Sequence, residues 1–229
     1  GSILFTLSYK TEIIKFIQSL NMNFLELFSG DRSFGKVAEK RGDKVFSIDW
    51  KNYPGTSLCC DIEFLKPENV PFTPDHGHAS FDCTTYTIAA ISTHRNGTEP
   101  KSEYAIKCDR VNQHFISMID EWLKLNPNFI FYIENPRGML RKMPFMQRFK
   151  RYTVWYCTYG DDRAKPTDIW TNSEVWQPRP MCHNGNKNCH HQSAPRGSKT
   201  GTQGLKNNYE RSKVPYELCK EILENINVY

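Results

Sequence analysis

The sequence predicts an α/β protein built on a doubly wound, mostly parallel sheet with a small irregular insert. Its core opens with a strand, a glycine turn, a helix and a second strand, which together form a βαβ unit. Strand and helix patterns then continue to alternate up to residue 171. A length of 229 residues suits one large domain with a modest appendage.

The βαβ unit can be followed residue by residue. Residues 24–28 form an apolar strand, followed by a turn that contains Gly30. Residues 33–40 have a helical pattern that stops at Gly42, because glycine readily adopts the left-handed conformation that ends many helices. A second strand over residues 45–48 completes the unit.

Further elements follow in the same alternation. Residues 102–125 predict a long helix, and residues 129–133 predict a short buried strand of apolar and aromatic side chains. Two extended segments are expected at 153–159 and 167–171. Pro215 begins a last amphipathic helix, since proline is favoured at the first helical position.

The chain divides into four parts on this basis. Residues 1–22 are an N-terminal extension with a helix, and residues 23–172 are the α/β core. Residues 173–208 are rich in Pro, Gly, Asn, Cys and His, which predicts a small irregular insert. Residues 209–229 form a helix that returns to the core.

Composition limits the class of protein. No stretch approaches the roughly 18 apolar residues needed to span a membrane, and no leader pattern opens the chain. We therefore expect a soluble cytoplasmic protein without a membrane partner. The eight cysteines then indicate reduced thiols, ligands or a nucleophile. The net charge of +5 fits a polyanionic partner and many ordinary enzymes alike.

The turn after the first strand predicts a nucleotide-type site. Phe28, Ser29 and Gly30 end that strand, and Asp49 ends the next one. Glycine allows a ligand to approach the backbone, and an acid about 20 residues further on can accept both hydroxyls of an adenosine ribose. The missing Gly-x-Gly-x-x-Gly pattern argues against a bound pyrophosphate. A tight turn with an exposed strand-end acid is the alternative.

Two further segments carry groups that could act chemically. Cys83 lies in a polar turn after a weak strand signal at 78–79, where its thiolate could attack an electrophilic carbon. Glu134 follows a buried strand, and Pro136 prevents that strand from continuing, so the carboxyl should project from the sheet's carboxyl edge. The alternatives are a small buried cysteine and a surface glutamate.

In this order, these segments resemble the DNA cytosine-5 methyltransferase family. Two later pieces extend the likeness: residues 159–167 are similar to the family's arginine-bearing motif, and residues 211–215 to its closing motif. The resemblance runs from about residue 23 to residue 226. The chain lacks a large recognition domain, and in this it resembles the compact enzymes of phages and of restriction-modification systems.

The resemblance implies methyl transfer from S-adenosylmethionine to C5 of a flipped-out cytosine in DNA, by a monomer. Cys83 is the implied nucleophile at C6, Glu134 its acid partner, and Arg163 the group that holds the base. The implied cosubstrate residues are Phe28, Ser29, Gly30, Phe34, Asp49, Trp50, Asp61, Ile62, Ser212 and Val214. The implied nucleic-acid contacts are Thr84, Arg137, Lys165, Arg196 and Lys199.

Two departures from the family pattern keep alternatives open. Phe81 and Asp82 stand where the family has a Pro-Pro pair, and a carboxylate next to the cysteine disfavours its thiolate. The chain could therefore be a weakened or inactive module that binds DNA or cosubstrate. The insert is also small, which leaves little surface for reading bases, so RNA or a free cytosine nucleotide is a second alternative.

The insert also contains closely spaced metal-ligating residues. Cys182, His183, Cys189 and His190 could bind zinc tetrahedrally and staple a loop too small to have a core of its own. The spacing is not the common Cys-x-x-Cys. In the alternative, the histidines face water or phosphate.

Overall fold

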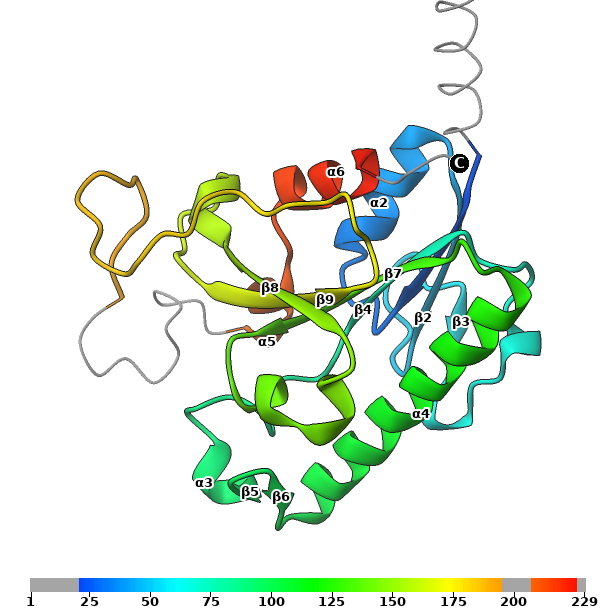
Figure 1. Ribbon diagram of the computed structural model, residues 1–229, viewed down its shortest axis with the longest axis horizontal. Coiled ribbons are helices and arrows are strands. Elements are labelled where there is room, and N and C mark those ends of the chain that lie inside the picture. The colour runs from blue at the N-terminus through cyan, green and yellow to red at the C-terminus, as the bar shows by residue number, and fades with distance from the viewer. Residues whose placement is uncertain (1–20, 195–206, 226–229) are drawn as a thin grey trace, which may run out of the picture.

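A computed structural model describes residues 21–194 and 207–225. Its centre is a seven-stranded sheet in which five parallel strands are followed by an antiparallel strand and a final one (Figure 1). This confirms the doubly wound, mostly parallel sheet. The helix expected within residues 1–22 lies almost wholly outside the described residues. In sheet order the strands are β3 (Leu58–Cys59), β2 (Lys44–Asp49), β1 (Asn23–Leu27), β4 (His76–Ser80), β7 (Ile130–Pro136), β9 (Pro166–Thr171) and β8 (Lys150–Trp155).

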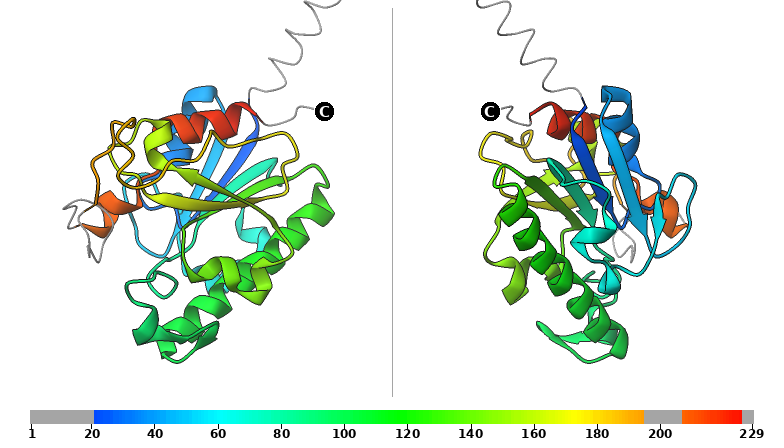
Figure 2. Two further views of the ribbon diagram at one scale, coloured as in Figure 1. Left: turned by 60° about the vertical axis from the view of Figure 1, so that its left-hand side comes forward. Right: turned by 90° about the vertical axis from the view of Figure 1, so that its right-hand side faces the viewer.

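Helices cover both faces of the sheet. α2 (Ser33–Arg41) packs against α6 (Tyr216–Glu224) on one face, and α4 (Glu103–Leu125) crosses the other (Figures 1 and 2). No described helix is long and apolar enough to cross a bilayer. Smaller elements surround this core: α3 (Ile91–His94), the hairpin of β5 (Arg95–Asn96) and β6 (Glu99–Pro100), and α5 (Asn208–Ser212).

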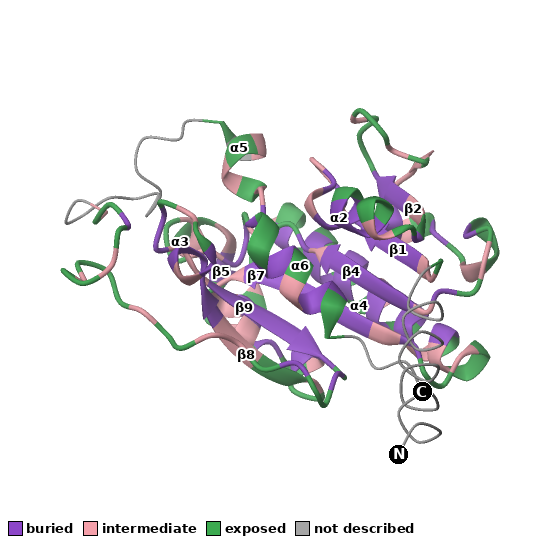
Figure 3. Cartoon of the chain, turned by 90° about the horizontal axis from the view of Figure 1, so that it is seen from above, coloured by how far each residue is buried: buried purple, intermediate pink, exposed green. Residues whose placement is uncertain are grey.

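The residues of β1 explain why helices cover both faces of the sheet, because successive side chains of a strand point to opposite faces. Phe24 packs with the α2 and α6 side chains, whereas Leu25 and Leu27 pack in the cluster that includes α4. The sheet is therefore buried on both sides, as the purple strands in Figure 3 show. Parallel strands covered on both faces are expected to be apolar throughout, as β1 nearly is.

The helix ends follow ordinary capping chemistry. Ser102 accepts the N–H of Ala105 with its hydroxyl at 3.1 Å and so begins α4. Gly42 ends α2 with a φ of 96°. The extended segment expected at 153–159 is different: β8 stops at Trp155, and residues Tyr156–Tyr159 form the 3₁₀ helix η5, which closes at Gly160.

Candidate functional site

The sheet order reverses between β1 and β4, and open α/β sheets bind ligands outside the carboxyl ends of their strands at such a point. A pocket lies there. Residues of β1, the following turn, β4 and the segment before α6 meet around it. Its lining consists of Glu26, Phe28, Ser29, Gly30, Asp31, Ser33, His78, Ser80, Ser212 and Val214.

The turn after β1 joins the pocket to the end of β2. Gly30 has a φ of 48° and donates its N–H to Asp49 at 3.0 Å. The second oxygen of Asp49 accepts the N–H of Lys51. Burial raises the pKa of the Asp49 carboxyl, and these backbone donors oppose that rise. The hydroxyl of Ser29 is buried without a partner among the described residues.

Five of the ten residues predicted for the cosubstrate line this pocket: Phe28, Ser29, Gly30, Ser212 and Val214. The other five do not line it. Trp50 is 62% exposed next to Asp49, and Asp61 forms an ion pair with Lys107 at 2.7 Å. The side chain of Ile62 is packed in the core, at 2% exposure. Phe34 stacks on His78 at 3.8 Å between ring centroids.

Two buried ionisable residues of the pocket were not predicted from the sequence. Glu26 accepts the N–H of Gly35 at 3.0 Å and the hydroxyl of Ser47 at 3.0 Å. Burial raises the pKa of Glu26 to about 7. Burial also lowers the pKa of His78 to about 3, and neither ring nitrogen has a hydrogen-bond partner among the described residues. Alternating polar positions on a strand ordinarily indicate an exposed face. The sequence pattern therefore does not predict that Glu26 and His78 are buried.

The Cys83 loop starts where β4 ends. Asp82 accepts the N–H of Thr84 at 2.8 Å with one oxygen and the hydroxyl of Tyr104 with the other. Aspartate commonly closes a turn by accepting a backbone N–H two residues on. Asp82 therefore restrains this loop by hydrogen bonding at the position where the family has a proline.

Strand pairing brings the cysteine loop to Glu134. Ser80 at the end of β4 pairs with Glu134, two residues before the end of β7. The expectation that Pro136 prevents the strand from continuing is wrong, because β7 includes Pro136, which pairs with Thr167 of β9. The side-chain amide of Asn135 donates to the carbonyl of Phe81 at 2.8 Å, which ties the two loops together. Glu134 is buried and accepts the hydroxyl of Tyr156 at 2.8 Å. The nucleophile and acid candidates thus leave neighbouring strands at the same edge.

The charges around Cys83 oppose one another. Burial raises the pKa of the Cys83 thiol to about 11, Lys165 lowers it, and Asp82 and Glu134 raise it further. Burial lowers the pKa of Lys165, which Glu134 and Cys83 oppose. Lys165 therefore interacts electrostatically with both candidate groups. The sequence placed it among the nucleic-acid contacts, and the structure places it beside Cys83 and Glu134.

Arg163 binds the chain itself. Its guanidinium pairs with Asp161 and donates to the carbonyls of Arg211 at 3.1 Å and Lys213 at 3.2 Å. It also lies over the ring of Tyr156, at 5.6 Å from the centroid. Arg163 is buried, so in this arrangement it holds the segment before α6 against the site.

A buried ion pair anchors the far side of the Cys83 loop. Arg95 binds both oxygens of Asp109, at 2.6 and 3.0 Å, and donates to the carbonyl of Thr85 at 2.8 Å. Tyr86 donates its hydroxyl to Asp109 at 2.7 Å. Gly138 adds a close contact, because a Cβ there would lie 2.4 Å from the carbonyl of Tyr86. These positioning contacts join residues far apart in sequence, so no local sequence pattern predicts them.

The remaining predicted nucleic-acid contacts are exposed or outside the described residues. Thr84 and Arg137 are exposed, and the guanidinium of Arg137 lies 5.6 Å from the ring centroid of Trp155. Arg196 and Lys199 fall in the stretch that the structure does not describe.

The predicted metal ligands are brought together only in part. Cys182 and Cys189 meet Cys157 and His191, and one ligand atom from each lies within 4.8 Å of the others. The predicted His183 is exposed, and His190 is exposed with its Nε2 3.0 Å from the carbonyl of Asp161. The prediction of His183 and His190 as ligands is therefore wrong: both side chains are exposed outside the cluster, and His190 is directed to the Asp161 carbonyl.

Comparison with known proteins finds remote likenesses among solved structures. No family model matches the sequence, and no curated protein matches it. Among solved structures, the chain is similar to the S. pombe Dnmt2 methyltransferase, with 15% identity and a TM-score of 0.46. The match covers 69% of this chain and 53% of that one, so the chain spans about half of that protein's length.

Proposed function

We propose that this chain transfers a methyl group from S-adenosylmethionine to C5 of cytosine in DNA. The pairing of Ser80 with Glu134 carries the proposal, since it brings the Cys83 loop and the Glu134 carboxyl to one edge of the sheet. The pocket at the switch point, which Ser80 also lines, lies next to them. A nucleophile, an acid and a ligand pocket at one sheet edge are the parts that a covalent methyl transfer requires.

The chemistry follows from the weakness of cytosine C5 as a nucleophile. Cys83 adds through its sulfur to C6, which moves electron density towards C5. Glu134 shares a proton with N3 and so neutralises the charge that develops in the ring. The methyl group then bonds to C5 as its bond to the sulfonium sulfur breaks, which releases S-adenosylhomocysteine. Loss of the C5 proton to water restores the ring and breaks the bond between the Cys83 sulfur and C6.

Lys165 supports the thiolate in this scheme. The pKa of Cys83, near 11 in the free protein, leaves little thiolate at neutral pH. Lys165 is the cation that lowers this pKa, and its charge also faces Glu134. The thiol proton therefore passes to solvent water before the sulfur attacks, a step that Lys165 favours because its charge stabilises the thiolate.

The pocket fits the polar cosubstrate. Gly30 presents backbone without a Cβ, and the buried hydroxyl of Ser29 has no partner among the described residues. Asp49, held by backbone N–H groups at the end of β2, suits the ribose hydroxyls. The exposed ring of Trp50 next to it suits the adenine face. S-adenosylmethionine supplies the electrophilic methyl group when it is bound.

The target base must leave its helix to reach Cys83, at a cost of a few kcal/mol of stacking and pairing. Thr84 and Arg137 are exposed beside the Cys83 and Glu134 loops and are the described residues that we assign to the nucleic acid. The insert offers few further contacts. Acceptance of RNA or a free cytosine nucleotide is therefore the outcome against which the proposal must be tested.

The test is transfer of label from S-adenosylmethionine to mixed-sequence duplex DNA, with RNA and dCMP as competing acceptors. We expect cytosine in DNA to be labelled by the parent chain and by Ser117→Ala, a control at an exposed residue of α4 outside the site. Cys83→Ser should be inert. If RNA or dCMP alone is labelled, the substrate is that acceptor and not DNA.

Asp82→Pro separates an active enzyme from a silenced one. If the parent is inert with every acceptor and Asp82→Pro transfers methyl groups, the chain is a silenced methyltransferase. If both are inert while S-adenosylmethionine still binds, the chain is a binding module. Active parent and active Asp82→Pro together would show that the hydrogen bonds of Asp82 replace the proline.

A further inference from the structure

Three thiols and an imidazole converge at the edge of the core. Cys157 comes from η5, whereas Cys182, Cys189 and His191 come from the insert. Their ligand atoms all lie within 4.8 Å of one another, and Sγ of Cys182 is 3.8 Å from Nδ1 of His191. In a tetrahedral zinc site with ordinary bond lengths, sulfur and nitrogen ligands are about 3.6 Å apart. The separation of 3.8 Å between Cys182 and His191 is close to an edge of such a tetrahedron.

The surroundings of the four side chains are those of a metal site. His191 is buried, and its Nε2 has no hydrogen-bond partner among the described residues. The side-chain amide of Asn186 donates to Sγ of Cys182 at 3.3 Å, as groups around metal-bound thiolates commonly do. Cys182 and Cys189 also pack against the apolar cluster of Trp155, Cys157 and Ala164.

The insert needs a crosslink of this kind. Between Thr171 and residue 194 the structure contains no helix or strand, and the loop extends from the sheet as the yellow to orange trace in Figure 1. Trp176 is buried at its start, but Val175 and Met181 are exposed. A loop with so small a core is typically held by a disulfide or a metal.

We propose that Cys157, Cys182, Cys189 and His191 bind one structural zinc ion. All four positions are filled by protein side chains, which is typical of structural rather than catalytic zinc. The set differs from a local zinc finger because its first ligand comes from the core, 25 residues before the second. The ion thus fastens the insert to η5.

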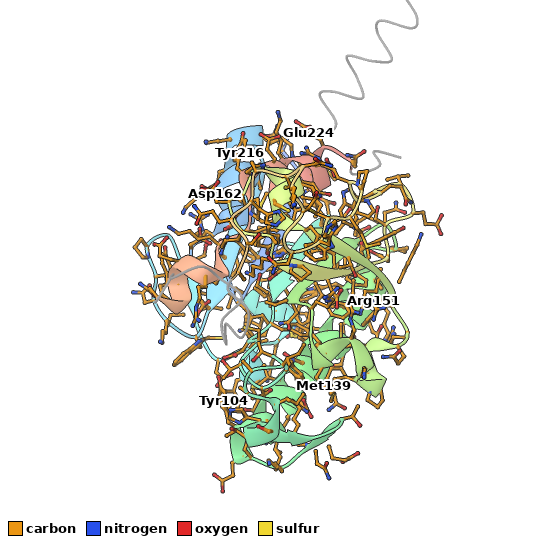
Figure 4. The ribbon with its side chains drawn as sticks, turned by 90° about the vertical axis from the view of Figure 1, so that its left-hand side faces the viewer. Tyr104, Met139, Arg151, Asp162, Tyr216 and Glu224 are labelled. Carbon is orange, nitrogen blue, oxygen red and sulfur yellow. The ribbon has the colours of Figure 1, made fainter. Side chains whose placement is uncertain are left out.

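The insert residues next to the zinc ligands contact the backbone of the two residues before Arg163. His190 lies 3.0 Å from the carbonyl of Asp161, and the N–H of Gln192 donates to the carbonyl of Asp162 at 2.9 Å. In Figure 4, Asp162 lies towards one end of the view and Tyr104, which binds Asp82, towards the other. The zinc site therefore supports the Arg163 end of the proposed active site and lies away from the start of the Cys83 loop.

The test measures metal in the full chain, produced with zinc and purified without chelator. Native mass spectrometry and elemental analysis should find one zinc per chain, lost from His191→Ala and Cys157→Ser. The matched controls are His183→Ala and His190→Ala, neighbours of two ligands that lie outside the cluster. Zinc-free parent protein, or zinc lost from a control and kept by His191→Ala, overturns the proposal.

A second measurement covers ligand variants that do not fold. Cobalt added to the metal-depleted parent should give the visible bands of tetrahedral Co²⁺ and a sulfur-to-metal charge-transfer band from three thiolates. With the thiols kept reduced, octahedral cobalt or the absence of a sulfur-to-metal charge-transfer band overturns the proposal. Both readouts are independent of methyl transfer, so failure of the proposed activity leaves this result interpretable.

Discussion

Replacing Glu26 with glutamine should stabilise the protein at neutral and alkaline pH. Burial raises the pKa of this carboxyl from an ordinary 4.5 to about 7, so the folded state keeps a proton that the unfolded chain releases. Between these values the contribution of Glu26 to the free energy of unfolding falls as pH rises, and above pH 7 the loss is constant. At about 1.4 kcal/mol for each pKa unit, the total is about 3 kcal/mol.

Glutamine should retain both hydrogen bonds of Glu26 and lose only its ion pair with Arg32, at 4.0 Å. Its oxygen can accept the N–H of Gly35, and its amide can donate to the hydroxyl oxygen of Ser47. We therefore expect Glu26→Gln to match the parent at pH 4 and to exceed it by about 3 kcal/mol at pH 8.

The assay is urea unfolding at a series of pH values, with Glu68→Gln, at an exposed glutamate, as the control. The control should track the parent throughout. A difference between Glu26→Gln and the parent that does not change with pH would refute the argument, since it would mean that Glu26 titrates alike in both states.

Three further outcomes are expected. Tyr156→Phe removes the hydroxyl that binds Glu134 and should lower kcat about tenfold or more, a change that steady-state methylation assays would detect; an unchanged kcat contradicts the assigned role of Glu134. Because the pKa of Cys83 is near 11, single-turnover rates should rise about tenfold per pH unit from about pH 7 to pH 9; a flat profile means that thiolate formation does not limit the reaction. Gly138→Ala brings a Cβ against the carbonyl of Tyr86 and should lower stability by about 1–3 kcal/mol, measured by thermal unfolding, whereas an unchanged Tm means that the loop yields.

Local patterns predicted the first half of the fold well. Residues 24–28, 33–40 and 45–48 correspond within one or two residues to β1, α2 and β2, because apolar periodicity and Gly42 specify them locally. The 3₁₀ turn of η5 was missed, since its aromatic run has a strand-like composition and only tertiary packing bends it.

The candidate site was less predictable where long-range contacts decide it. The positions of Cys83 and Glu134 at strand ends could be inferred from the chain, but the ion pair of Arg95 with Asp109 joins residues 14 positions apart with no periodic signal. Cys157 could not be grouped with Cys182 for the same reason. Closeness in sequence favoured His183 and His190 as ligands, whereas the fold selects His191.

The pairing of Ser80 in β4 with Glu134 in β7 bears on how this protein could be redesigned. Because hydrogen bonds between β4 and β7 set the spacing of the two loops, that spacing cannot drift without unzipping the centre of the sheet. The stretch after Thr171 leaves the end of β9, the next-to-last strand in the sheet order, and residues 172–194 contribute no strand to the sheet. A longer or foreign recognition segment grafted there would change what is read while leaving the reacting groups in register.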